Sequence, residues 1–124
     1  MIKWFRALIG SGEHASTNMD DEAGEQAVLI HVHAEDVQSD DPVSDLATLE
    51  DDLQEIIGDL GEVDGHDIGS DDATVYVYGR SAEEIFAAIR SHLISGELTG
   101  RAKVTLRYGP PDSSERVVQL PHDR

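Results

Sequence analysis

The sequence predicts an α+β fold, in which an antiparallel sheet is packed against two helices. Several short runs alternate apolar and polar residues, as strands with one buried face do. Two longer segments instead repeat apolar residues every three or four positions, which is typical of amphipathic helices. Along the chain these patterns follow the order strand, helix, strand, strand, helix, strand, strand.

The first strand and the first helix are predicted in the first half of the chain. Residues 27–34 alternate in the manner of a strand. The helix is expected to begin with Asp40 or Asp41 as its cap, and Pro42 suits the first helical position. Glycines just after the apolar stripe are expected to end it. The buried face of the strand comprises Val28, Ile30 and Val32, the stripe comprises Leu46, Leu49, Leu53, Ile56, Ile57 and Leu60, and the terminating glycines are Gly58 and Gly61.

A hairpin is predicted at the centre of the chain. Residues 74–78 are rich in β-branched and aromatic side chains, which favour strands. In the strand before them, the odd separation of Val63 and Ile68 would point these two apolar residues to opposite faces. A β-bulge at Asp64-Gly65 would restore the register. An alternative is that Asp64-Gly65 is itself a hairpin turn.

The second helix is predicted to follow this hairpin. Ser81 is a good cap, and Glu84 three residues later completes the pattern of a capping box. The helix is expected to stop near Gly96. Its apolar stripe comprises Ile85, Phe86, Ile89 and Leu93, with Ala82 and Ala88 beside them.

Two further strands are predicted after this helix, over residues 102–108 and 115–120, with a proline-containing turn at 109–113 between them. The complete order is that of a ferredoxin-like βαββαβ sandwich with an added C-terminal edge strand. We therefore expect both helices on one face of the antiparallel sheet and an open opposite face. The residues expected on the open face or its edges are His31, His33, Tyr76, Tyr78, Lys103 and Arg107.

The sequence divides into three parts. Residues 27–120 are expected to form one domain, because about 100 residues can bury a single core. Residues 1–26 combine a short amphipathic segment, 1–10, with a flexible acidic linker. Residues 121–124 are expected to be a tail.

The strongest compositional feature is negative charge. The chain has 26 acidic and 9 basic residues, a formal net charge of −17. Such a chain should be repelled by nucleic acids and anionic membranes and attracted to a basic protein. The alternative is that the acidity only promotes solubility or reflects adaptation to the environment of the source organism.

The chain has no cysteine, which excludes disulfides and thiolate metal sites and is compatible with the reducing cytosol. No stretch approaches the length of a membrane span. We therefore expect a cytoplasmic protein without a membrane-spanning segment.

Two sequence blocks resemble those of a group of small, uncharacterised bacterial α/β proteins. Residues 61–66 read Gly-Glu-Val-Asp-Gly-His, and residues 107–111 read Arg-Tyr-Gly-Pro-Pro. The resemblance extends over about residues 27–120. It implies one compact bacterial domain, and it implies no activity, because none is established for that group.

Metal binding is the sharpest chemical alternative. His31 and His33 are two residues apart on one strand face, a spacing that can chelate a metal. His66, with Asp64 or Asp67, would have to complete the site from the hairpin. The simpler interpretation is that these are solvated or hydrogen-bonded side chains, because one His-x-His pair supplies only two ligands. We therefore predict no metal site and no cofactor.

Function is predicted only at the level of class. No nucleophile elbow or phosphate-binding glycine loop is present, so we expect a non-enzymatic binding module, such as an immunity protein or antitoxin that binds a basic protein. Homodimerisation through the open face or the edge strand is a related prediction. The alternative is a small-ligand or metal-binding protein. The candidate binding residues are His31, His33, Asp64, His66, Tyr76, Tyr78 and Arg107.

Overall fold

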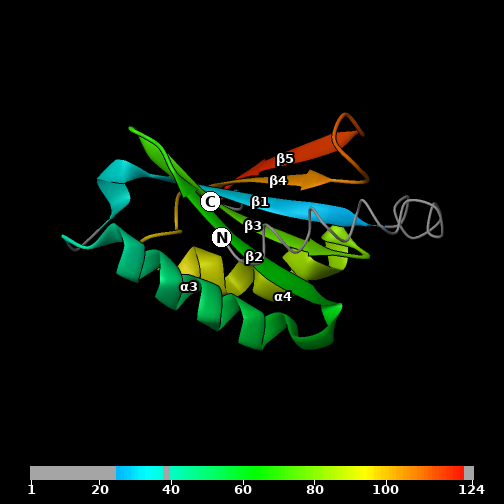
Figure 1. Cartoon of the computed structure of the whole chain (residues 1–124), viewed down its shortest axis with the longest axis horizontal. Coiled ribbons are helices and arrows are strands. Elements are labelled where there is room, and N and C mark those ends of the chain that lie inside the picture. The colour runs from blue at the N-terminus through cyan, green and yellow to red at the C-terminus, as the bar shows by residue number, and fades with distance from the viewer. Residues whose placement is uncertain (1–24, 38–39, 122–124) are drawn as a thin grey trace.

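The computed structural model describes residues 25–37 and 40–121 (Figure 1). The predicted N-terminal amphipathic segment and most of the predicted linker and tail lie outside these residues. The described strands are β1 (Gln26–His33), β2 (Gly61–Ile68), β3 (Asp72–Gly79), β4 (Lys103–Arg107) and β5 (Glu115–Gln119), and the described helices are α3 (Pro42–Ile57), α4 (Ala82–Ser95) and the short 3-10 turns η1 (Ala34–Asp36) and η2 (Gly58–Leu60).

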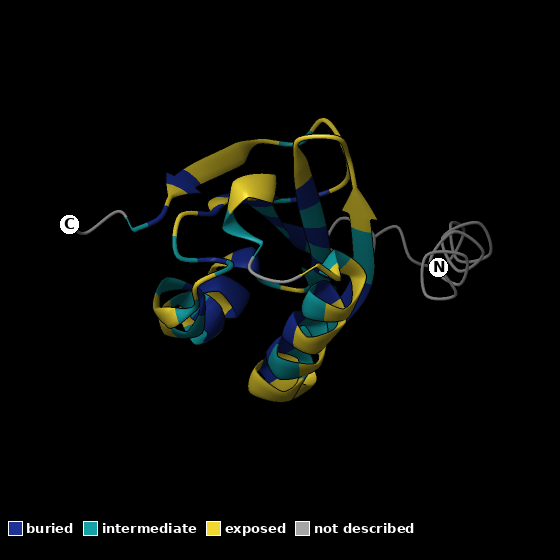
Figure 2. Ribbon diagram, turned by 90° about the vertical axis from the view of Figure 1, so that its left-hand side faces the viewer, coloured by how far each residue is buried: buried dark blue, intermediate teal, exposed yellow. Residues whose placement is uncertain are grey.

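The strands form one five-stranded antiparallel sheet in the order β2-β3-β1-β4-β5. In its centre, Ile30 of β1 lies opposite Val75 of β3 and Val104 of β4. Side chains opposite one another point to the same face, so these three buried residues belong to one apolar surface. Both helices cover this surface (Figure 2). The prediction of an α+β fold with an antiparallel sheet is confirmed.

The core combines this sheet surface with one stripe from each helix. The predicted stripe of α4 is buried, whereas the predicted stripe of α3 was too long: Ile56 is 40% exposed and Leu60 is 37% exposed. Leu60 lies beyond the helix, because α3 ends at Ile57 and Gly58 (φ 53°) turns the chain into η2. Ile56 is inside α3, next to the buried Ile57, and lies at the exposed margin of the stripe. The helical residues in the core are Leu46, Leu49, Leu53, Ile57, Ala82, Ile85, Phe86, Ile89 and Leu93.

Both predicted helix caps are present. The Asp41 side chain accepts a hydrogen bond from the Ser44 amide at 3.1 Å, and the Ser81 hydroxyl accepts one from the Glu84 amide at 3.1 Å. Each bond satisfies one of the amides that have no partner within the first turn of a helix. α4 ends at Ser95, next to the predicted Gly96.

The predicted bulge in β2 is also confirmed. Val63 lies opposite Val77, but the next paired residue is Gly65, opposite Tyr76. Asp64 is therefore the extra residue, and Gly65 has a positive φ of 146°. After the bulge, each residue of β2 points to the sheet face opposite to the one that uninterrupted alternation would give. The bulge therefore decides on which face His66 and Asp67 lie.

Candidate functional site

The sheet surface opposite the helices is the candidate site, and we call it the open face. No described helix covers it (Figures 1 and 2). Its residues are arranged in rows across the strands, because paired residues share a face. From β3 through β1 to β4, the rows are Tyr78–Ala27–Arg107, Tyr76–Leu29–Thr105 and Thr74–His31–Lys103.

His31 lies in the third row and is held by hydroxyl groups on both sides. Its Nδ1 is 3.1 Å from Thr74 Oγ1 and its Nε2 is 3.4 Å from Thr105 Oγ1. Partial burial and then the neighbouring Lys103 lower the pKa of His31 below its ordinary value. His31 is therefore a hydrogen-bonded side chain whose charged form is disfavoured in the folded protein.

Tyr76 links the first two strands of the sheet. Its hydroxyl donates a hydrogen bond to Asp67 Oδ2 at 2.8 Å. Burial, followed by this hydrogen bond, raises the pKa of Tyr76 to about 12. The phenol is thus a fixed neutral donor, and its ring is only partly buried.

Tyr78, Asp64 and Arg107 form a charged group at one end of the open face. Burial and the nearby Asp64 raise the pKa of Tyr78, whereas the positive charge of Arg107 opposes this shift. Arg107 also donates from Nε to the Gly109 carbonyl at 3.1 Å. Glu25 is close enough to this group that burial, followed by repulsion from Asp64, raises the pKa of its carboxyl. Sequence reasoning missed Glu25, which precedes the strand.

His66 does not belong to the open face. It lies opposite the buried Val75, and its Nδ1 is 2.6 Å from Glu50 Oε2 on α3. The three histidines considered as the metal-binding alternative are therefore divided between the two sides of the sheet, because the bulge shifts the parity of β2. His33 stays on the β1 strand, exposed, opposite Asp72. Within residues 25–37 and 40–121, no group of three or more His, Cys, Asp or Glu side chains is placed to hold a metal ion.

Charge is distributed unevenly over the open face. Glu62 and Asp67 lie on β2, opposite the β3 residues Tyr78 and Thr74, whereas Lys103 and Arg107 lie on β4. The two sets are separated by β3 and β1 in the strand order. The position of Glu62 on this face was missed from the sequence, because it depends on the register in which Gly61 pairs with Gly79.

Comparisons with family models, curated proteins and solved structures found no match for this chain. The resemblance carried by residues 61–66 and 107–111 stays a prediction. Among the described helices, none has the length and apolar character needed to cross a membrane.

Proposed function

We propose that this protein is a non-enzymatic binding module built on a ferredoxin-like sandwich, and that it binds a protein partner through the open face. The fold assignment is supported by the strand order β2-β3-β1-β4, which is the order a split βαβ arrangement requires. β5 then extends the sheet at the β4 edge.

The observation that carries the proposal is a group of aromatic and aliphatic side chains, Leu29, Tyr76, Tyr78 and Val117, that are partly or fully exposed on a sheet surface that no described helix covers. Tyr76 and Tyr78 lie beside Leu29 and Ala27, and Val117 of β5, next to Thr105, is 56% exposed. Tyrosine is enriched at protein interfaces, since its ring buries apolar area while its hydroxyl makes a hydrogen bond. Here the Tyr76 hydroxyl is already oriented by Asp67.

The charge distribution indicates the kind of partner. The net charge of −17 favours fast association with a basic protein at low salt. Exposed acids on α3 and η2, including Asp51, Glu55 and Asp59, extend this negative field over the helix side. At short range, the acidic β2 side and the basic β4 side of the open face would fix the orientation of the bound partner. Immunity proteins and antitoxins that neutralise cationic toxins are one class with these requirements.

Site-specific photocrosslinking in cells that naturally make the protein would test the proposal. A photoreactive residue at Val117, on the open face, is compared with one at Ala87, which is exposed on α4. We expect a protein adduct from position 117 and none from position 87. The double variant Tyr76→Ala/Tyr78→Ala should lose the adduct while it keeps a cooperative thermal transition.

Three outcomes would contradict the proposal. Equal adducts from both positions would show that crosslinking does not report the open face, and no adduct from position 117 would remove the support for this interface. An adduct with twice the mass of the chain would assign the face to self-association instead of a basic partner. Metal analysis of the purified protein would test the metal-binding alternative.

A further inference from the structure

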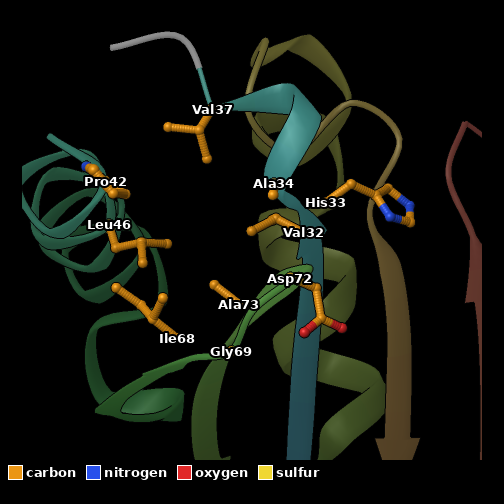
Figure 3. Close-up of a pocket in the computed structure, with 10 residues that line it drawn as sticks. All are labelled: Val32, His33, Ala34, Val37, Pro42, Leu46, Ile68, Gly69, Asp72 and Ala73. Atoms are coloured by element: carbon orange, nitrogen blue, oxygen red, sulfur yellow. The ribbon is translucent and has the colours of Figure 1, made fainter. Parts of the chain in front are cut away.

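An apolar pocket lies at one end of the molecule, apart from the open face. It has a volume of about 320 Å³ and is formed where η1, the start of α3 and the β2–β3 turn meet (Figure 3). The Ala34 amide donates to the Asp71 carbonyl at 3.0 Å, so the turn is held against η1. This volume of about 320 Å³ is near the lower limit for ligand pockets, roughly 300 Å³, and is large enough to admit an apolar side chain.

The walls of the pocket are aliphatic. Val37, Pro42, Leu46 and Ile68 surround the space in Figure 3, and the polar side chains of His33 and Asp72 point away from it. Ile68 is 48% exposed although it lines the pocket. An apolar group that enters would therefore remove apolar surface of the protein from water, which favours binding.

Acidic residues adjoin the lining residues in the sequence, and we call them the acidic rim. Asp40 and Asp41 directly precede the lining residue Pro42, and Asp71 precedes the lining residue Asp72. On the η1 side, Glu35 and Asp36 are partly offset by Arg101, which contacts each carboxylate at 2.8 Å. The chemistry that complements this site is an apolar side chain flanked by positive charges.

We propose that this pocket binds a cationic peptide segment of a partner protein, with one aliphatic side chain in the pocket and flanking lysine or arginine side chains on the acidic rim. This inference rests on the proposed function, in that the ligand is a protein. It concerns a different surface, however, because the lining residues Val32 and Ala73 point to the helix side of the sheet, where they belong to the core.

Titration of the full-length protein with synthetic peptides would test this proposal. The probe is a peptide with one leucine flanked on each side by two lysines. The comparison peptides replace the leucine by alanine or the lysines by glutamates. We expect the first peptide to shift the NMR amide signals of Val37 and Ala73. The alanine peptide should bind about tenfold more weakly or worse, and the glutamate peptide should not bind.

Two sets of variants separate the pocket from its rim. Ala34 lines the pocket and is itself exposed, so Ala34→Leu should fill the space and weaken binding about tenfold. Its matched control is Ala87→Leu on α4, which should bind like the wild type. Asp40→Asn/Asp71→Asn should weaken binding and its salt dependence, whereas Asp51→Asn/Asp59→Asn removes the same charge elsewhere and should have less effect.

Specific results would overturn the proposal. Equal binding of the leucine and alanine peptides, unchanged binding by a folded Ala34→Leu variant, or shifts confined to the open face would each exclude the pocket as an anchor site. Trp4 belongs to the predicted amphipathic segment 1–10. Tighter peptide binding by full-length Trp4→Ser would assign the pocket to this segment of the same chain. Self-association that Ala34→Leu abolishes would assign it to a second copy. None of these results would affect the crosslinking test, because Val117 lies on the open face.

Discussion

At the scale of single residues, the open face is built from side chains with fixed hydrogen-bond roles. His31 lies between the hydroxyl groups of Thr74 and Thr105, in strands on either side of it. Tyr76 donates to Asp67 across a strand pair. Such side chains present a preorganised surface, which reduces the entropy lost when a partner binds.

Protonation of His31 is expected to destabilise the fold. Its pKa is lowered in the folded state, so below pH 6.5 the unfolded chain binds more protons and stability falls as the pH falls. Urea unfolding of the wild type at about pH 7.5 and 5.5 should show this loss, and His31→Gln should reduce it. His33→Gln, on the exposed neighbouring position, is the control. An identical pH dependence in wild type and His31→Gln would contradict this prediction.

The ionisation of Tyr76 provides a second measurement. The raised pKa of about 12 depends partly on Asp67, because the neutral phenol donates to this carboxylate and the phenolate would be repelled by it. We expect Asp67→Asn to lower the pKa of Tyr76. NMR titration, limited to the pH range in which circular dichroism shows the fold, would measure it, with Tyr76→Phe to assign the signal. An unchanged titration in Asp67→Asn would show that the hydrogen bond does not persist in solution.

At the scale of elements, the edge strand β2 is positioned by contacts at its beginning. The Gln54 amide of α3 donates to the Gly61 carbonyl at 3.2 Å and accepts from the Val63 amide at 2.9 Å. Gly61 also lies opposite Gly79 of β3. A Cβ atom on Gly79 would be 2.4 Å from the Leu60 carbonyl oxygen. The two backbone segments therefore approach so closely that only glycine fits at position 79.

Alanine at Gly79 is therefore expected to be strongly destabilising. The overlap is with backbone atoms, which cannot rotate away, and overpacking of this kind costs about 3 kcal/mol. Gly58→Ala is the comparison, because no heavy atom lies within 4 Å of its added Cβ. Only its backbone is unfavourable there: φ 53° with ψ −121° lies outside the left-handed helical region, and a non-glycine residue in such a conformation costs about 2 kcal/mol. Thermal unfolding of both variants would check the order, and equal losses would argue against the close approach.

At the scale of the whole molecule, charge is the dominant property. The formal net charge of −17 raises the free energy of the compact state through self-repulsion. The ion pairs formed by Arg101 and Arg116 are exposed, and such pairs contribute little. The field that would attract a basic partner therefore also opposes folding.

Added salt is expected to stabilise the protein. Raising sodium chloride from about 0.02 to 0.2 M shortens the screening length severalfold, which weakens the repulsion between carboxylates. We expect the thermal midpoint to rise by about 3 °C or more for a domain of this size. Differential scanning calorimetry would measure it, and a midpoint that falls with salt would show that attractive ion pairs outweigh the net charge.

Much of the architecture was accessible from local sequence patterns. The caps at Asp41 and Ser81, the stop near Gly96 and the bulge at Asp64-Gly65 were all predicted, because each depends on a few neighbouring residues. The predicted stripe of α3 wrongly included Leu60, since apolar spacing alone does not show where the last helical turn gives way to a glycine turn. It also wrongly included Ile56, because spacing alone does not show how wide a face of the helix the sheet covers.

The sequence alone determined the α+β class, the negative charge, and the alternation that separates a buried from an open sheet face. These properties depend only on residue type and periodicity. The tertiary structure decided which side chains meet. It placed His66 beside Glu50 instead of beside His31, joined Tyr76 to Asp67, and formed the pocket from η1, α3 and the β2–β3 turn. Such contacts join residues far apart in the chain, and a one-residue shift in strand parity reverses the face on which each lies.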